Sequence, residues 1–577
     1  MADATEVRTG TQATSAIHRD ATVSPHDLDP RRWAALACVI TALFMVLLDV
    51  SIVNVAIPAI RSNLSANDAD IQFVVAGYGL SYAVMLITGG RLGDIFGRKR
   101  LFLMGMAGFV LTSALCGLAQ SAVMLDLSRV AQGLMAALMY PQVLSVIQVS
   151  FPPHERARVF GLVGAVIGIA TIMGPLVGGL IIRNDITGSS WRWIFLVNVP
   201  IGVVSLLAAY RVVSESKAPN ATRLDLVGVA IASSGLFLLV FPLVQGQVAG
   251  WPLWTYLCMA ASPFVLAAFV LYERSLPANR FPLVQLSLFN IRSFSLGVPI
   301  SAIFIAGIPA FFFTFSLTVQ VGLQWSALHA GLTSIPWSIG SAVFSALSVR
   351  LAPKLGRYVI TVGSALLVLG ILGVILTLHL RGVNVSSYDL IPSYVVAGSG
   401  LGFIIAPLLN VILAGVPGRD AGSASGVVTT FQQLGGAMGV AVVGVVFFGL
   451  LSGRSATAVT QVTPQLQQQL SAAEPGTPAP VIAQQVAKFS HCFQLEVSSS
   501  DPTQTPAGCP AISTAPTANP VSRAFQRAAL QALASDFVSS WERILFFNVG
   551  LWLVVGVLSL MLPPVRLQPQ GPAPAAH

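Results

Sequence analysis

Long apolar runs recur along nearly the whole chain, and they constrain its fold more than any other feature of the sequence. A helix that crosses a bilayer needs about 20 mainly apolar residues. Runs of this kind predict about fourteen membrane-spanning helices. Their approximate positions are 33–57, 71–91, 100–120, 123–150, 157–182, 191–212, 226–246, 252–272, 294–319, 327–349, 358–380, 389–415, 422–451 and 541–563. An even number of spans places both termini on the same side of the membrane.

The composition excludes a water-soluble protein. Hydrophobic residues make up 55% of the chain and charged residues only 9%, whereas a soluble domain has roughly 25% charged residues. The net charge of +9 would favour a nucleic-acid partner in a soluble chain. Here the cations are spread over loops, where they orient the helices and contact anionic lipid headgroups. We therefore expect the lipid bilayer, and no nucleic acid, as a partner.

Cationic loop residues predict the orientation, because Lys and Arg accumulate in short cytoplasmic loops. If the chain starts inside, the outer loops contain only Arg61, Arg183, Arg192 and Arg381. The inner loops contain Arg98, Lys99, Arg100, Arg156, Arg158, Arg211, Lys217, Arg223, Arg274, Arg280, Arg292, Lys354, Arg357 and Arg419. This asymmetry predicts a multi-pass protein of the cell membrane with both termini in the cytoplasm. The abundance of Arg, Ala and Gly is typical of a bacterial gene.

The segment GGRLGDIFGRKR, which joins the second and third predicted spans, has a counterpart in the second half of the chain. It combines Asp94, a glycine turn at Gly97 and three successive cations at 98–100. A weaker copy, VRLAPKLGRYVI, begins at Val349. A loop repeated at the same topological position in both halves is typical of an internally duplicated transporter.

Asp49 and Arg129 lie within predicted spans, where charges are costly and usually functional. Asp49 is deep in the first span, and burial disfavours the ionised form of a carboxylate, as a proton carrier requires. The alternative is a carboxylate paired to a cation, or capped by Asn54, for packing alone. Asp126 lies three residues before Arg129 on the same helix face, and we expect these two side chains to pair. That pair is either a local ion pair near the outer surface or a guanidinium that helps a carboxylate release its proton.

The fifth predicted span has a glycine-rich second half that contains Gly174, Pro175, Gly178 and Gly179. Small residues let helices approach closely, and a proline can kink a span. We expect a break at Pro175, either as a hinge or as part of ordinary close packing.

The polar region 452–540 lies before the last span, on the outer side of the membrane. We expect amphipathic helices around 464–470 and 523–537 and a loop between them. Cys492 and Cys509 fall in this region, in the oxidising compartment, and are candidates for a disulfide. Their spacing alone does not establish the geometry.

No residue pattern predicts catalysis, a cofactor or a metal. The sequence has no phosphate-binding loop of the Gly-Lys-Ser/Thr type and no metal-ligand spacing among its histidines. The aromatic run 311–315, with Trp325 and Trp337, fits packing or lipid-facing positions better than cavity walls. We therefore expect a transporter and not an enzyme.

Four motifs in order, LDVSIVNVAIPAI, GRLGDIFGRKR, RVAQG and GPLVGG, resemble the major facilitator superfamily. More narrowly, they resemble its fourteen-helix drug–proton antiporter branch. The match covers nearly the whole chain except the tails and the region 452–540. It implies an all-α integral membrane fold, with two six-helix bundles around a midplane cavity and two further helices inserted between them. It also implies alternating access driven by proton influx.

The resemblance also assigns roles to particular residues. Asp94 would brace the inward gate against the N-terminus of a helix that begins at Asp420. Arg129 matches the arginine linked to proton coupling, and Asp49 lies in the first-helix motif of the branch. The gating motif comprises Gly90, Asp94, Gly97, Arg98, Lys99 and Arg100, and the antiporter motif comprises Gly174, Pro175, Gly178 and Gly179.

The implied domains follow the spans. They are a disordered cytoplasmic tail (1–32), an N-terminal six-helix bundle (33–213), a linker with two inserted helices (214–292), a C-terminal six-helix bundle (293–563) that includes the outer region 452–540, and a cytoplasmic tail (564–577).

The resemblance implies a proton-coupled exporter of drugs or amphipathic small molecules that works as a monomer. Some multidrug cation exporters of this branch carry acidic residues in the helix equivalent to the tenth predicted span, 327–349, which has none. This departure from the family pattern favours a neutral, monocationic or lipid-like cargo. A second hypothesis is an exporter of a lipid or another cell-envelope component, in which the region 452–540 binds a periplasmic partner. A nutrient importer is a further alternative, because a fold does not determine the direction of transport.

Overall fold

The computed structural model describes residues 29–64, 66, 68–184, 190–217, 224–246, 249–276, 282–417, 420–498, 509 and 519–563, and every regular element in these ranges is a helix. Short segments complete the longer helices: α6 (Trp193–Leu196) leads into α7, a π-helical turn (Thr318–Gly322) extends α10, and α11 (Ala327–Thr333) precedes α12. The long helices are α1 (Arg32–Leu64), α2 (Asp68–Phe96), α3 (Arg98–Gly117), α4 (Ala122–Ser150), α5 (Pro153–Asn184), α7 (Asn198–Val212), α8 (Leu226–Gln245), α9 (Leu253–Ser275), α10 (Arg292–Leu317), α12 (Ile335–Leu355), α13 (Tyr358–Arg381), α14 (Ser387–Leu413), α15 (Ala421–Ala473), α16 (Ala479–Ser498) and α17 (Pro520–Ser559). The predicted tails lie outside the described residues, apart from 29–32.

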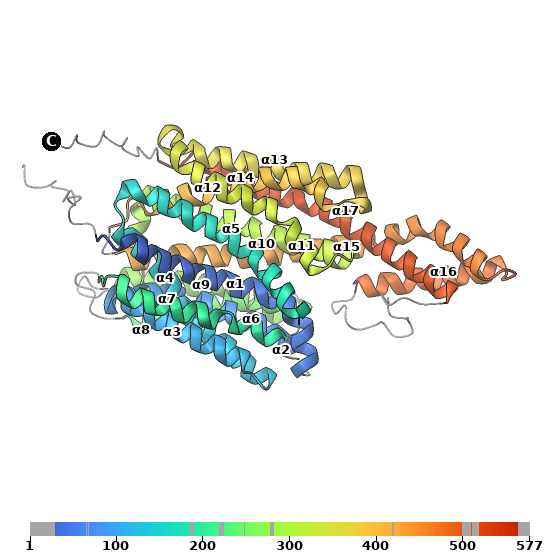
Figure 1. Ribbon diagram of the computed structural model, residues 1–577, viewed down its shortest axis with the longest axis horizontal. Coiled ribbons are helices and arrows are strands. Elements are labelled where there is room, and N and C mark those ends of the chain that lie inside the picture. Colours follow the sequence, from blue (N-terminus) through green and yellow to red (C-terminus); the bar gives the residue numbers. More distant parts are fainter. Residues whose placement is uncertain are drawn as a thin grey trace, which may run out of the picture.

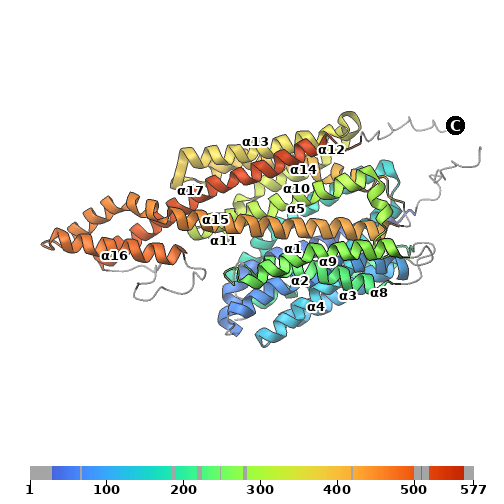
Figure 2. The same cartoon turned by 180° about the vertical axis from the view of Figure 1, so that it is seen from behind.

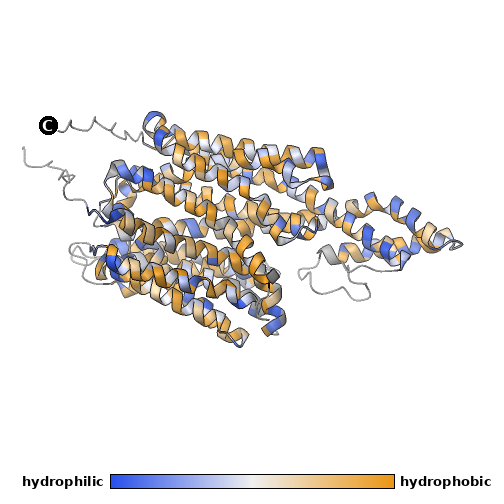
Figure 3. Ribbon diagram, viewed as in Figure 1, coloured by the Kyte–Doolittle hydropathy of each residue, from blue (hydrophilic) through white to orange (hydrophobic). Residues whose placement is uncertain are grey.

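Helices of membrane-spanning length make up the body of the molecule. Within the described ranges, 12 helical segments are long and apolar enough to cross a membrane. The helices α2 and α5, with 29 and 32 residues, occupy the positions of the other two predicted spans. Apolar residues cover the whole length of the bundle, and polar residues gather at its ends and on the segment that projects from it (Figure 3). The prediction of an all-α integral membrane fold is confirmed.

The spanning helices form two groups that lie side by side (Figure 1). In the first group, α4 packs against α2 and α3, and α1 packs against α5 and α7. In the second group, α14 packs against α12 and α13, and α15 packs against α10 and α17. The two groups meet where α5 packs against α12 and α14, and where α15 packs against α2 and α4. The helices α5 and α15 therefore connect the two groups.

The helices α8 and α9 form a separate pair. In the sequence, this pair follows the first helix group and precedes the second. They pack against each other, and α8 also packs against α2 of the first group and α15 of the second. Figure 2 shows this pair from the side on which it covers the bundle. The inserted pair therefore contacts both helix groups.

The turn between α2 and α3 consists of Gly97 alone. Its φ of 109° is one that residues with a side chain rarely adopt. The next helix of this group, α4, begins with a side-chain cap, because Ser121 Oγ accepts a hydrogen bond from the Met124 N–H at 3.3 Å. Such a cap satisfies one of the N–H groups that have no partner within the helix.

The C-terminal part of α15, the whole of α16 and the N-terminal part of α17 form a projecting unit, which extends beyond one end of the bundle (Figures 1 and 2). With 53 residues, α15 is much longer than a membrane span, since a helix rises about 1.5 Å per residue and a bilayer core is about 30 Å thick. The same holds for α17, which has 40 residues. The unit has a hydrophobic core of its own, formed by Ala458, Val459, Val462, Leu466, Leu470, Ile482, Val486, Phe493, Ala524, Ala528 and Ala532.

The prediction of a loop in the middle of region 452–540 is wrong for residues 479–498, which form α16. The apolar residues Ile482, Val486 and Phe493 recur at helical spacing and are buried, and α16 packs against α15. A helix with one apolar face is stable when that face is covered. The structure also joins Cys492 on α16 to Cys509 by a disulfide, with their Cα atoms 5.5 Å apart.

Candidate functional site

A buried ion pair lies within the first helix group. Asp49 on α1 and Arg129 on α4 are 0% and 1% exposed, and Arg129 Nη1 lies 2.5 Å from Asp49 Oδ2. Arg129 Nε donates a hydrogen bond to the Val74 carbonyl on α2 at 2.9 Å. The guanidinium also lies over the Tyr78 ring, 4.3 Å from its centroid, where the face of the ring attracts a cation. The pair therefore links α1, α2 and α4.

Gln132 and Asn198 complete the hydrogen bonds of the Asp49 carboxylate. Gln132 Nε2 donates to Asp49 Oδ1 at 2.9 Å, and Asn198 Nδ2 donates to the same oxygen at 3.2 Å. Gln132 Oε1 accepts from Arg129 Nη1 at 2.7 Å. Gln132 lies three residues after Arg129 on the same face of α4, so its spacing in the sequence could have identified it as a member of this site. Asn198 has no such signal, because it lies at the start of α7 and reaches Asp49 only in the folded chain.

The predicted pair between Asp126 and Arg129 is wrong. Arg129 contacts Asp49 instead, because α1 passes beside α4 and presents a carboxylate that Gln132 also holds. Asp126 Oδ1 is buried and has no hydrogen-bond partner among the described residues. The side chain of Asn54, the alternative cap for Asp49, lies outside the described part of the chain.

The cluster around Asp49 is a buried pair of opposite charges. A buried carboxylate and a guanidinium stabilise each other's charge, and removing one partner costs about 3–5 kcal/mol because the other charge stays buried. A proton on Asp49 would neutralise the carboxylate and weaken its attraction for Arg129. The ion pair therefore stabilises the contact between α1 and α4.

Asp94 at the end of α2 faces the N-terminus of α15. Its Oδ1 accepts a hydrogen bond from the Gly422 N–H at 3.1 Å, and its Oδ2 accepts one from the Ser423 N–H at 3.0 Å. Arg98 Nη2 donates to Asp94 Oδ1 at 2.8 Å. The first N–H groups of a helix lack intrahelical partners, and the helix dipole favours a negative charge there. This is the contact that the family resemblance implies, and it joins the two helix groups.

The same contact requires glycine on both helices. A Cβ atom at Gly90 of α2 would lie 2.4 Å from the carbonyl oxygen of Gly422, and a Cβ atom at Gly422 of α15 would lie 2.5 Å from the carbonyl oxygen of Gly90. A Cβ atom at Gly426 would lie 3.1 Å from the carbonyl oxygen of Leu86. The backbones of α2 and α15 therefore approach each other along a full turn beside Asp94.

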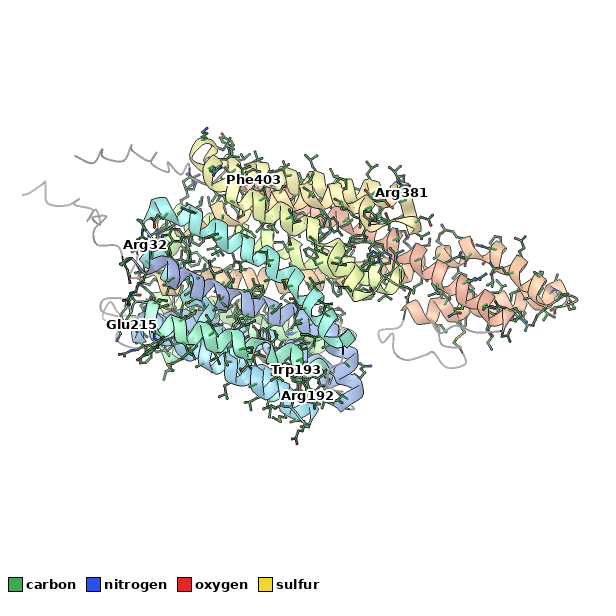
Figure 4. All side chains as sticks on the ribbon, viewed as in Figure 1. Arg32, Arg192, Trp193, Glu215, Arg381 and Phe403 are labelled. Carbon is green, nitrogen blue, oxygen red and sulfur yellow. A yellow bond between two sulfur atoms is a disulfide. The ribbon has the colours of Figure 1, made fainter. Side chains whose placement is uncertain are left out.

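The residues that follow Asp94 make hydrogen bonds and an ion pair with the segment after α7. The Arg98 N–H donates to the Ser216 carbonyl at 3.0 Å, and the Lys99 N–H donates to Glu215 Oε1 at 3.2 Å. Arg100 lies 3.7 Å from Glu215 Oε2 in a largely exposed pair. Figure 4 shows Glu215 and Arg32 at the same end of the bundle. We call this end, which contains Asp94, the gate end.

Further hydrogen bonds join the two helix groups near the gate end. Ser145 Oγ donates to the Ala421 carbonyl at 3.3 Å. Gln148 Nε2 donates to the Leu413 carbonyl at 2.8 Å. On the other side of the interface, Ser345 Oγ of α12 donates to the Gly161 carbonyl of α5 at 2.9 Å. Hydrogen bonds therefore join the two helix groups at this end of the bundle. Sequence reasoning missed these residues, because Ser and Gln within helices have no distinguishing pattern.

The glycines of the predicted antiporter motif lie where α5 meets other helices. A Cβ atom at Gly174 would lie 3.0 Å from the Ile52 nitrogen on α1. A Cβ atom at Gly179 would lie 3.9 Å from the Leu328 nitrogen on α11, and Gly178 is buried. The predicted break at Pro175 is absent, since α5 is continuous from Pro153 to Asn184. A proline removes one backbone hydrogen bond without ending a helix that its neighbours support.

The aromatic residues of the second helix group pack into its interior. Phe311, Phe315 and Trp337 are at most 3% exposed, and the ring centroids of Phe311 and Trp337 lie 5.0 Å apart. Tyr394 and Trp541 complete this aromatic core. The packing interpretation of these three residues is confirmed. Among the described residues, no three His, Cys, Asp or Glu side chains are arranged to hold a metal ion.

Comparison with known families decides the identity of the fold. The family model described as the Major Facilitator Superfamily matches residues 39–226 and 212–440, and these ranges contain Asp49, Asp94 and Arg129. The chain belongs to the major facilitator superfamily. It is therefore a membrane-spanning transporter, and its relatives include proteins of Streptomyces and Mycobacterium.

Individual relatives cover most of the chain. The probable actinorhodin transporter of Streptomyces coelicolor is 38% identical over 543 residues, which are 94% of this chain and 93% of that protein. The tetracenomycin C resistance and export protein of Streptomyces glaucescens is 34% identical over 425 residues, or 72% of this chain and 76% of that protein. The crystal structure of the human organic anion transporter MFSD10 has a TM-score of 0.54 at 13% identity and covers 91% of this chain and 100% of that one. That likeness concerns the fold alone.

Proposed function

We propose that the protein is a proton-coupled exporter of drugs or amphipathic small molecules that works by alternating access. The observation that carries this proposal is the fully buried pair of Asp49 and Arg129, in a transporter whose gate end is closed around Asp94. The relatives named as antibiotic transporters and export proteins support the cargo class. The cargo crosses the membrane chemically unchanged, so the protein is not an enzyme.

The proposed coupling begins at Asp49. A proton that arrives from the outer side neutralises this carboxylate and releases Arg129, which loosens the contact between α1 and α4. The next turn of α1, with Ser51 and Ile52, packs closely on Gly174 of α5, and α5 packs against α12 and α14 of the second group. A change at Asp49 thus reaches the interface between the groups.

The cycle is completed at the gate end. Separation of Asp94 from the N-terminus of α15 opens this end, where Asp49 releases its proton to the cytoplasm and cargo enters. Return of the Asp49–Arg129 pair closes the gate end and exposes the cargo to the outside. Export therefore uses the proton gradient, because only the deprotonated carboxylate restores the ion pair.

The proposed orientation places the gate end and both termini in the cytoplasm of a bacterial cell. It rests on the accumulation of cations in loops at that end, as expected for cytoplasmic loops. The proposed domains are the two bundles 33–213 and 293–563, with 214–292 as the linker that holds α8 and α9. We propose a monomer, as the family resemblance implies.

A second candidate function is the export of a lipid or another cell-envelope component to an extracytoplasmic partner. The projecting unit favours it, because this unit has its own hydrophobic core and a disulfide. In this alternative, the unit holds the partner or the cargo after the cargo leaves the membrane.

Proton flux in proteoliposomes tests the first function directly. Purified protein is reconstituted, a pH gradient is imposed, and a panel of amphipathic compounds, including aromatic antibiotics, is added while a pH-sensitive dye reports proton movement. Proton movement that depends on one of these compounds supports the exporter. If none of them moves protons, while replacement of α16 by a short Gly-Ser linker abolishes an envelope phenotype in cells, the second function is favoured.

A further inference from the structure

Glu273 is a buried carboxylate in the last turn of α9, within the inserted helix pair. Glu273 is 5% exposed. Its Oε1 accepts hydrogen bonds from the Leu283 N–H at 2.9 Å and from the Val284 N–H at 3.4 Å. Leu283 and Val284 belong to residues 282–285, an irregular segment that we call the strap, which precedes α10. Glu273 therefore fixes the strap to the end of α9.

The strap also contacts the helix that closes the gate end. The Leu283 carbonyl accepts a hydrogen bond from Ser423 Oγ at 3.4 Å. The N–H of the same Ser423 donates to Asp94 Oδ2 at 3.0 Å. Leu283 and Val284 are 0% and 4% exposed, so these two residues of the strap are buried in the protein. A continuous chain of hydrogen bonds thus runs from Glu273 through Leu283 and Ser423 to Asp94.

Charges on three elements surround this chain of hydrogen bonds. Arg91, one turn before Asp94 on α2, is buried and is attracted by Asp94, Asp420 and Glu273. The helix α8 lies against the Glu273 carboxylate, since a Cβ atom at Gly228 would lie 3.2 Å from Glu273 Oε1. Glu273 therefore sits where α9, α8, α2 and the start of α15 come together.

We propose that Glu273 is a positioning residue for the cytoplasmic gate, and that through it the inserted helices α8 and α9 stabilise the closed gate end. This inference rests on the proposed gating role of Asp94. Glu273 holds the strap in the position from which Leu283 accepts the hydrogen bond of Ser423. Opening the gate end must break this bond or carry the strap away from α9, so the anchor at Glu273 biases the gate toward the closed state.

Thiol accessibility at the gate end tests the proposal without measuring transport. Ala421, the first residue of α15, is 0% exposed, and an Ala421→Cys reporter reacts with a water-soluble maleimide only when the gate opens. The background carries Cys258→Ser, because Cys258 is the free cysteine that is not fully buried among the described residues. Labelling rates are measured on purified protein in lipid nanodiscs. The elution profile and the unfolding temperature of each variant are recorded first.

Glu273→Ala should label roughly tenfold faster than the parent, since it removes both hydrogen bonds that fix the strap to α9. Glu273→Gln keeps one carbonyl oxygen that can accept from the Leu283 N–H, and it should stay within about threefold of the parent. Ser423→Ala removes the strap contact from the other side and should accelerate labelling in the same direction, even if Glu273→Ala does not fold. Ser275→Ala is the matched control, because Ser275 is exposed in the same turn of α9 and its Oγ donates a hydrogen bond to the Tyr272 carbonyl at 2.7 Å.

Two results would overturn the proposal. The first is a parental labelling rate in Glu273→Ala and Ser423→Ala, while Asp94→Asn labels fast; this refutes the role of Glu273 and leaves the gate intact. The second is equal acceleration by Glu273→Gln and Glu273→Ala, which contradicts an anchor made of hydrogen bonds. If Asp94→Asn also labels at the parental rate, the gating role of Asp94 itself fails. Once a substrate is known, the positioning role further predicts a changed kcat at constant KM in Glu273→Ala.

Discussion

Replacement of Asp94 by Asn should open the gate end, and the structure sets the size of the effect. Asp94 accepts hydrogen bonds from two N–H groups of α15 and from Arg98. Asn keeps one acceptor oxygen, but its NH2 group would face an N–H donor, and the charge is lost. A hydrogen bond to a charged group contributes about 1.5–3 kcal/mol, and a charge at a helix N-terminus adds about 0.3–2 kcal/mol. We therefore expect the closed gate to lose about 2–4 kcal/mol, which is roughly a 30- to 700-fold shift toward opening.

The assay is the maleimide labelling of the Ala421→Cys reporter, which is buried while the gate end is closed. Glu155→Gln is the matched control, because Glu155 forms a partly exposed ion pair with Arg32, 3.0 Å away, at the same end of the bundle. Such a surface pair contributes about 0–1 kcal/mol, so the control should label close to the parental rate. A labelling rate for Asp94→Asn no higher than that of Glu155→Gln would refute the gating assignment. A change in cargo preference without a change in labelling would also refute it.

Two further predictions concern stability. Gly97→Ala should lower the free energy of unfolding by about 1–3 kcal/mol, since φ at Gly97 is 109° and such conformations cost this much for other residues. Thermal unfolding in detergent measures this loss. An equal loss in the helical control Gly79→Ala, whose Cβ atom would have no neighbour within 4 Å, would contradict the backbone explanation. Cys492→Ser combined with Cys509→Ser should destabilise the projecting unit by about 3 kcal/mol, the value expected for a cross-link that closes a loop of this length. Faster proteolysis of that unit, with the spanning helices intact, would show this loss, whereas a resistance equal to that of Cys258→Ser would exclude it.

The spanning helices and the charged residues of the site were predictable from the sequence for the same physical reason. A bilayer requires long apolar helices, and charges within them, such as Asp49 and Arg129, are therefore conspicuous in the sequence. The position of Asp94 beside the start of α15 followed from the family resemblance, not from the physics of the loop. What the sequence did not reveal is which carboxylate Arg129 contacts. Asp126 is near it in the chain, but Asp49 is near it in the fold.

Contacts between distant helices account for most of what was missed. Asn198 and Gln148 make hydrogen bonds to residues far away in the chain, and a single polar residue in an apolar helix does not show which neighbour it will face. The helix α16 was missed for another reason. It is polar on most of its surface, and its apolar face, with Val486 and Phe493, is stable only against α15 and α17.

The most direct test of the central claim compares the wild-type protein with Asp49→Asn in proteoliposomes. Asn is nearly isosteric with Asp and can still accept hydrogen bonds from Gln132 and Asn198, but it cannot titrate. Proton flux and cargo movement are recorded with the same compound under an imposed pH gradient. We predict that the wild type moves protons when cargo is present, and that Asp49→Asn moves none and exports no cargo against a gradient, although it still exchanges cargo across the membrane. Normal proton-driven export by Asp49→Asn would contradict the account and remove Asp49 from the coupling mechanism.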